Sequence, residues 1–68
     1  MELEVICVGT ELLRNKLNTN IVYIGEKLNS IGLELSRAIT IPDNLQEMIK
    51  TFKEVFTHAE IVFIVGGL

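Results

Sequence analysis

The sequence has few of the residues that mark several large classes of protein. Tryptophan is absent, proline occurs once, and Cys7 is the only cysteine, so the chain cannot form an internal disulfide. No apolar run approaches the ~20 residues that a helix needs to cross a bilayer. The opening residues Met1-Glu2-Leu3-Glu4 lack the basic segment of a signal peptide. We therefore expect a cytoplasmic protein with no membrane partner, in which Cys7 is a buried core residue rather than a catalytic thiol.

Positive charge is also scarce. Six Lys and Arg residues stand against nine Asp and Glu residues, and the formal net charge is −3. This balance gives no electrostatic footprint for nucleic acid or for an anionic membrane surface. The 68 residues allow at most one domain, and a chain of this length buries too little surface to be very stable alone. We interpret residues 1–68 as the N-terminal part of a single domain, and expect a homo-oligomer, either dimer or trimer.

The hydrophobic pattern predicts alternating strands and helices. Three apolar or alternating segments are typical of strands: Leu3–Val8, 33–41 and 61–65. Residues 19–31 and 44–56 carry apolar side chains at helical spacing, and Gly32 stands where a glycine commonly ends a helix. The β-α-β-α-β order predicts an α/β fold with a parallel sheet covered by helices.

Polar residues collect where the predicted strands end. The first strand is followed by Gly9-Thr10-Glu11, the second by Pro42-Asp43-Asn44, and the third by Gly66-Gly67. Asn18-Thr19-Asn20 leads back into the first helix. Ligands of open parallel sheets bind outside the carboxyl ends of the strands. This edge of the sheet is therefore the predicted binding site.

Each of these residues also has a simpler structural interpretation. Asp43 can cap the second helix, or it can face the cleft as a general base or metal ligand. Glu11 can be a solvated loop acid, or it can hold a ribose hydroxyl or a divalent ion. Gly66 and Gly67 can form a tight turn, or they can let backbone N–H groups approach a phosphate. His58, near the end of the second helix, is predicted to complement the helix dipole, and a ligand role is the alternative.

Asn18 and Asn20 are most simply turn and cap residues.

Several familiar motifs do not occur. Gly9-Thr10-Glu11 replaces the G-x-G-x-x-G dinucleotide fingerprint after the first strand, and there is no G-x-x-x-x-G-K-[ST] phosphate loop. No Cys/His cluster for zinc and no nucleophile elbow are present. These features argue against a typical NAD enzyme, P-loop NTPase or α/β-hydrolase.

Four signatures occur in order along the chain: VGTELL after the first strand, NTN at the first helix, Pro-Asp-Asn before the second helix, and an apolar strand ending in GGL. Together they resemble the N-terminal domain of the CinA (competence/damage-inducible protein) family. That domain is similar to the molybdopterin-binding domain of the MogA, MoaB and gephyrin proteins of molybdenum-cofactor biosynthesis. The resemblance implies a three-layer α/β/α fold with a mostly parallel sheet.

The resemblance also implies a function. Molybdopterin-type members bind the pterin and catalyse Mg²⁺-dependent adenylyl transfer, whereas CinA-like domains are linked to pyrophosphatase activity on ADP-ribose and similar nucleotides. We expect a Mg²⁺-dependent nucleotide pyrophosphatase, a hydrolase. The alternatives are a molybdopterin adenylyltransferase and a binding or oligomerisation module without catalysis.

Residue by residue, the resemblance implies that Asp43 serves the phosphate or metal site as a catalytic residue, assisted by Glu11. It also implies a group that binds the nucleotide or pterin: Gly9, Thr10, Asn18, Asn20, Gly66 and Gly67. The stretch 14–17 is one residue shorter than usual in the family, and Val65 stands where many molybdopterin-type members have Thr. The family's G-P-T-x-D-D motif, with further acids, would lie after Leu68.

Overall fold

The computed structural model describes residues 1–9 and 19–66. The elements are, in chain order, β1 (Leu3–Val8), α1 (Thr19–Ser30), β2 (Arg37–Ile41), α2 (Leu45–Val55) and β3 (Ile61–Gly66). The predicted β-α-β-α-β order is thus confirmed. Among these elements no helix is long and apolar enough to cross a membrane.

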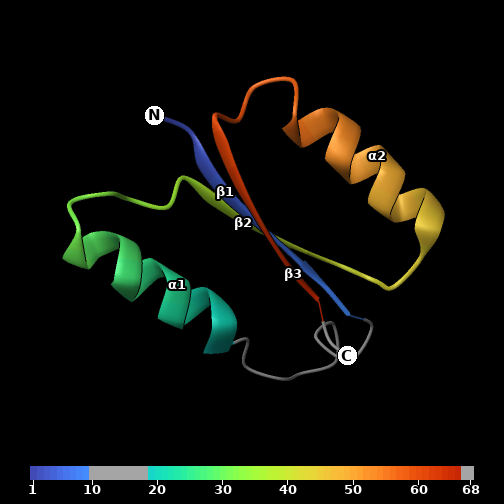
Figure 1. Ribbon diagram of the computed structural model, residues 1–68. Helices are drawn as coiled ribbons and strands as arrows, with labels where there is room; N and C mark the ends of the chain where they lie inside the picture. The colour runs from blue at the N-terminus through green and yellow to red at the C-terminus, as the bar shows by residue number, and fades with distance from the viewer. Residues whose placement is uncertain (10–18, 67–68) are drawn as a thin grey trace.

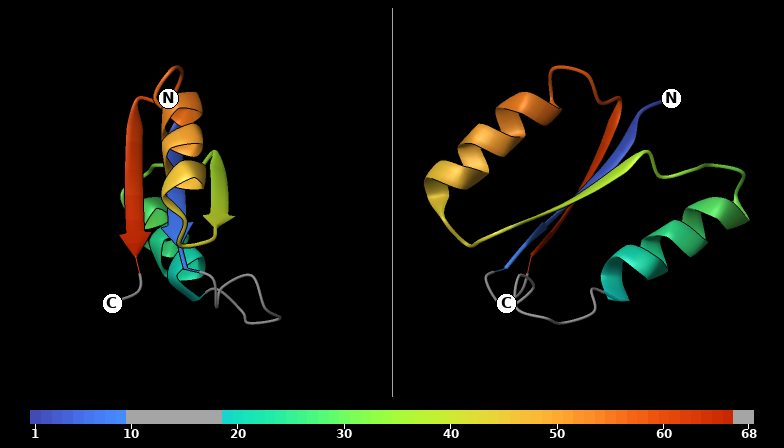
Figure 2. Two further views of the ribbon diagram at one scale, coloured as in Figure 1. Left: turned by 90° about the vertical axis from the view of Figure 1, so that its right-hand side faces the viewer. Right: turned by 180° about the vertical axis from the view of Figure 1, so that it is seen from behind.

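The strands form one parallel sheet in the order β2-β1-β3. The left panel of Figure 2 shows β1 between its two neighbours. Its central position explains the complete burial pattern of LEVICV, because β1 is covered on both faces and paired at both edges. Val8 pairs with Ile41 on one side and with Gly66 on the other. The register therefore brings the carboxyl ends of all three strands to one edge of the sheet.

The two helices lie on opposite faces of the sheet, which is seen edge-on in Figure 1. Side chains of a strand alternate between the two faces. On the α2 face, Ile6, Val8, Ile41 and Val55 form a buried core cluster, with Val55 fully buried. The side chain of Cys7 faces the opposite side of the sheet. It is a free, fully buried thiol, as expected for a core residue. The chain thus has the helix–sheet–helix layers of a three-layer α/β/α fold.

The second strand is shorter than predicted. Residues 33–36 alternate like a strand, but β2 begins at Arg37. The sheet itself gives the reason, since the β1–β2 ladder starts at the pair Glu4–Arg37 and Ser36 already bonds to Leu3 at the start of β1. Residues before Ser36 lie beyond the amino-terminal start of β1 and therefore have no strand to pair with.

The helix ends follow local sequence signals. Gly32 has φ +82°, and its N–H and that of Leu33 bond back to the carbonyls of Asn29 and Leu28. These are the two bonds of a Schellman C-cap, as predicted for this glycine. At the start of α2 the N-cap is Asn44, whose Oδ1 accepts from the Glu47 N–H at 3.1 Å. The prediction that Asp43 caps α2 is therefore wrong, because the Glu47 N–H donates to the side chain of Asn44 instead.

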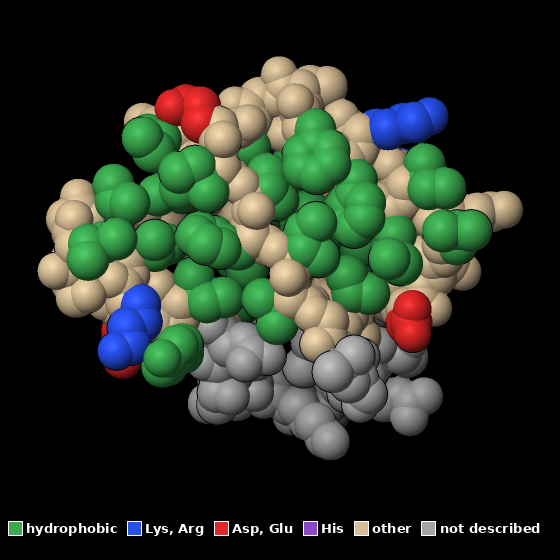
Figure 3. Space-filling view, viewed as in Figure 1, with side chains coloured by type: hydrophobic (Ala, Val, Ile, Leu, Met, Phe, Trp, Pro, Cys, Tyr) green, Lys and Arg blue, Asp and Glu red, His purple; other side chains and the backbone are tan. Residues whose placement is uncertain are grey.

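The sheet exposes apolar side chains along β3. Ile61, Phe63 and Ile64 are 37%, 37% and 51% exposed. Within the described residues β3 pairs only with β1, so its other edge has no neighbouring strand. Figure 3 shows hydrophobic side chains gathered over the middle of the face that is viewed in Figure 1. A surface of this kind is typical of a place where further protein packs. The expected homo-oligomer stays a prediction.

Candidate functional site

The carboxyl edge of the sheet is formed by the ends of three strands held in register. The N–H of Gly9, directly after β1, donates to the carbonyl of Ile41, the last residue of β2, at 3.0 Å. Gly9 is buried at this junction. Gly66 ends β3 opposite Val8, and a Cβ added to it would meet no atom of the described chain within 4 Å. The edge thus combines a fixed backbone with open space beside a glycine.

Asp43 is exposed between the end of β2 and the first turn of α2. The structure therefore brings Asp43, Gly9 and Gly66 to the same edge of the sheet. Asn20 lies in the first turn of α1, and the helix begins at Thr19, so Asn20 follows the helix start rather than preceding it. The other predicted site residues, Thr10, Glu11, Asn18 and Gly67, lie outside the described residues.

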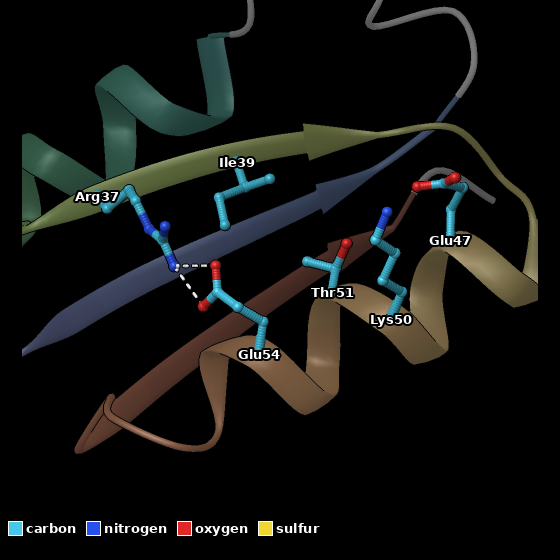
Figure 4. Close-up of a pocket in the computed structure, with 6 residues that line it drawn as sticks. All are labelled: Arg37, Ile39, Glu47, Lys50, Thr51 and Glu54. Atoms are coloured by element: carbon cyan, nitrogen blue, oxygen red, sulfur yellow. Dashed lines mark hydrogen bonds and ion pairs between the residues drawn. The ribbon is translucent and has the colours of Figure 1, made fainter.

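A second feature is a groove between α2 and β2, with a volume of about 330 Å³. It is lined by Arg37, Ile39, Glu47, Lys50, Thr51 and Glu54, of which all but Ile39 are polar or charged. Figure 4 shows the Arg37 guanidinium reaching from β2 across to the carboxylate of Glu54 on α2. This ion pair closes one end of the groove, with Nη2 of Arg37 2.9 and 3.1 Å from the two carboxylate oxygens.

The same guanidinium belongs to a charged cluster at the opposite, amino edge of the sheet. We call Glu4, Arg37, Glu54 and His58 the amino-edge cluster. Glu4 lies in β1 and is fully buried. Its Oε1 accepts from Arg37 Nε at 2.7 Å, and its Oε2 lies 2.5 Å from Nε2 of His58. A buried carboxylate is costly unless it is paired, and here both oxygens have charged or polar partners.

The neighbours of Glu4 also set its protonation state. Burial acts to raise the pKa of Glu4, but the hydrogen bonds and charges of Arg37 and His58 outweigh burial and lower this pKa below its ordinary value. The hydrogen bond to Glu54 and then the bond to Glu4 raise the pKa of Arg37. Glu4 is thus held as a carboxylate and Arg37 as a cation.

Sequence reasoning missed this cluster. The predicted role of His58 was to complement the dipole of α2, and its close contact with Glu4 was not foreseen. One signal was present, because Glu4 interrupts the otherwise apolar run LEVICV of a strand predicted to be buried. A charged residue at a buried strand position requires a partner. The partners come from positions 37 and 58, and only the register of the sheet reveals them.

Comparison with known proteins agrees with this architecture. The model of the family described as "Probable molybdopterin binding domain" matches residues 4–68. The chain belongs to this family. It is 44% identical over 68 residues to a CinA-like protein of Endomicrobium trichonymphae, and 42% identical over 69 residues to a CinA-like protein of Kosmotoga olearia. No solved structure matches the chain at a significant level.

The similarity extends over the whole chain but over only part of each relative. All of the chain is covered in both comparisons, whereas it spans 16% of the Endomicrobium protein and 17% of the Kosmotoga protein. The family match starts at Glu4 and thus includes all the described strands and helices, apart from Leu3, the first residue of β1. The carboxyl edge is therefore part of a molybdopterin-binding domain of the α/β class.

Proposed function

We propose that the carboxyl edge binds a phosphorylated nucleotide or pterin and forms part of a Mg²⁺-dependent pyrophosphatase site for ADP-ribose-like nucleotides. The observation that carries the proposal is the convergence of Gly9, Asp43 and Gly66 at one edge of a parallel sheet. Ligands of such sheets bind at this edge. Membership of a molybdopterin-binding family supports a small-molecule ligand with a phosphate group.

Gly66 has a property that a phosphate site requires. Phosphate oxygens need close approach to backbone N–H groups, which a side chain would obstruct. The space beside Gly66 is open in the described part of the chain, and Gly9 anchors the neighbouring strand end through its bond to Ile41. We propose that Gly67, Thr10 and Asn18 add further contacts to the phosphate and the ligand.

The carboxylate of Asp43 fits a Mg²⁺ site, because hard cations prefer oxygen ligands and this side chain is exposed at the edge. A bound Mg²⁺ would neutralise phosphate charge. We propose that Asp43 holds the metal or orients the attacking water, and that Glu11 holds ribose or the metal. Water attacks one phosphorus atom of the phosphoanhydride, its bond to the bridging oxygen breaks, and ADP-ribose yields AMP and ribose 5-phosphate.

The test is incubation of the purified protein with ADP-ribose and Mg²⁺, with AMP measured by chromatography. We expect Asp43→Asn to lower the rate by about 100-fold or more, the scale of losing a group that acts on the reacting water. Glu26→Gln, an exposed acid on α1, is the matched control and should leave the rate unchanged. Equal rates of AMP release from wild type and Asp43→Asn would refute the catalytic role of Asp43.

The alternative function is molybdopterin adenylyltransferase, which the description of the matching family favours. This enzyme would use the same edge, but it would join AMP to a pterin phosphate and release pyrophosphate from ATP. Fluorescence of a pterin that co-purifies with the protein would support this alternative. Binding of ADP-ribose without turnover would instead support a binding module without catalysis.

A further inference from the structure

We propose that Glu2, Glu4 and His58 form a binding site for a transition-metal ion such as Zn²⁺ at the amino edge of the sheet. This site is separate from the carboxyl edge and does not depend on the function proposed there. One donor atom of each of the three side chains lies within 4.8 Å of the other two. Two carboxylates and one imidazole are a donor set that suits Zn²⁺ and Co²⁺.

Two of the donors already face each other closely. Oε2 of Glu4 and Nε2 of His58 are 2.5 Å apart, and Oε1 of Glu4 is engaged by Arg37. Two lone pairs cannot face each other at this distance, so a proton lies between the two atoms. A metal ion that binds here would displace that proton. A small outward shift of the half-exposed His58 ring would give the metal the space that the proton does not need.

The other ring nitrogen of His58 lies near a carboxylate. Nδ1 lies 3.6 Å from Oε2 of Glu54, one helical turn earlier. In metal sites the second ring nitrogen commonly donates to a carboxylate, which fixes the tautomer and directs the free lone pair at the metal. Nη2 of Arg37 lies 3.4 Å from Nε2 and bonds to both carboxylate oxygens of Glu54.

The backbone around Glu2 positions the third donor. The carbonyl of Glu2 accepts from the N–H groups of Glu60 and Ile61 at 3.0 and 3.2 Å, and its N–H donates to the Glu60 carboxylate at 3.1 Å. Its side chain is exposed and can rotate toward His58. Glu2, Glu4 and Glu54 each place a carboxylate oxygen near the His58 ring, and this negative charge favours a divalent cation.

The first test is calorimetric titration of the purified, EDTA-treated protein with ZnCl2, followed by the absorption spectrum of the Co²⁺ form. We expect one ion per chain. Glu2→Gln retains all the backbone bonds of Glu2 and should weaken binding about 10-fold, while His58→Gln should weaken it about 100-fold. Glu54→Gln, which acts through the imidazole, should weaken binding about 10-fold. Glu47→Gln, at the opposite end of α2, is the matched control and should bind like wild type.

A second measurement does not depend on the stability of any variant. His58 is the only histidine among the 68 residues, so its ring ¹⁵N signals can be assigned without ambiguity. Addition of Zn²⁺ should shift the Nε2 signal strongly and leave Nδ1 protonated. Absence of Zn²⁺ binding, equal affinity of wild type and His58→Gln, or an unchanged Nε2 signal at saturating Zn²⁺ would each overturn the proposal.

Discussion

Glu4 and His58 are in contact through Oε2 and Nε2, 2.5 Å apart, although 54 positions separate them in the chain. The contact joins the central strand β1 to the turn that follows α2. Arg37, at the start of β2, holds the other oxygen of the same carboxylate. One buried side chain thus links the central strand, its neighbour and the turn that follows a covering helix.

Replacement of Arg37 by Met is expected to lower the free energy of unfolding by about 1–3 kcal/mol, because it leaves the buried Glu4 oxygen without its donor. The Met side chain retains most of the apolar stem of Arg37. Lys53→Met on the exposed face of α2 is the matched control, with an expected change within about 0.5 kcal/mol. Urea unfolding followed by circular dichroism measures both. A loss in Arg37→Met no greater than in the control would contradict the structural role of the ion pair.

Stability is also expected to fall in acid through Glu4. Burial raises the pKa of Glu4, yet the bonds and charges of Arg37 and His58 lower it further, so the folded state binds this proton less readily than the unfolded chain. The stabilisation that the ionised Glu4 gives to the fold is therefore complete above the unfolded pKa of about 4.3. It is lost as the pH falls through the lower pKa of the folded state. Urea midpoints measured in the presence of EDTA should therefore decrease as the pH is lowered through this range.

The Glu4→Gln variant isolates that effect from other acids of the region, such as Glu2 and Glu54. Its urea midpoint should depend less steeply on pH below about pH 4.3 than that of wild type, because the amide does not titrate. At neutral pH the variant should be less stable, since it loses the charge that pairs with Arg37 and His58. Parallel pH profiles for the two proteins would show that Glu4 does not carry the acid sensitivity.

The order and type of the elements could be predicted because each depends on local pattern. LEVICV has the length and composition of a buried strand, and β1 occupies Leu3–Val8 as predicted. The amphipathic helices begin and end within a residue or so of the expected positions. The error at residues 33–36 has a nonlocal cause. Whether an alternating segment pairs depends on where its neighbour begins, and β1 begins too late to reach it.

The candidate sites differ in how far the sequence could reveal them. The convergence of strand ends at the carboxyl edge follows from parallel topology alone, and the register of Val8 with Ile41 and Gly66 agrees with it. The roles assigned to Asp43 and the glycines there stay predictions. The amino-edge cluster depends on which residues pair across the sheet and on where the chain passes after α2. Glu4 alone signals that a partner is needed, without indicating that the partners are Arg37 and His58.

The N-cap of α2 provides a local prediction. Asn44→Ala should destabilise the protein by about 1 kcal/mol, because the Glu47 N–H loses the side-chain oxygen that accepts from it. Asn44→Asp is the matched control, since its carboxylate can accept the same bond, and its stability should stay within about 0.5 kcal/mol of wild type. Thermal unfolding of the three proteins measures the differences. If the two variants were equally destabilised, the hydrogen bond to Glu47 would not be the cause.

Two glycines on and after α1 should respond in opposite directions to the same substitution. Gly32 has φ +82°, so Gly32→Ala forces an L side chain into the left-handed region and should cost about 1 kcal/mol. Gly25 lies inside α1, where an added Cβ meets no described atom within 4 Å. Gly25→Ala should therefore stabilise the protein by up to about 1 kcal/mol, since alanine favours the helix over glycine. Urea unfolding of both variants checks the signs. Destabilisation by Gly25→Ala would mean that a close neighbour of this position restricts the helix surface.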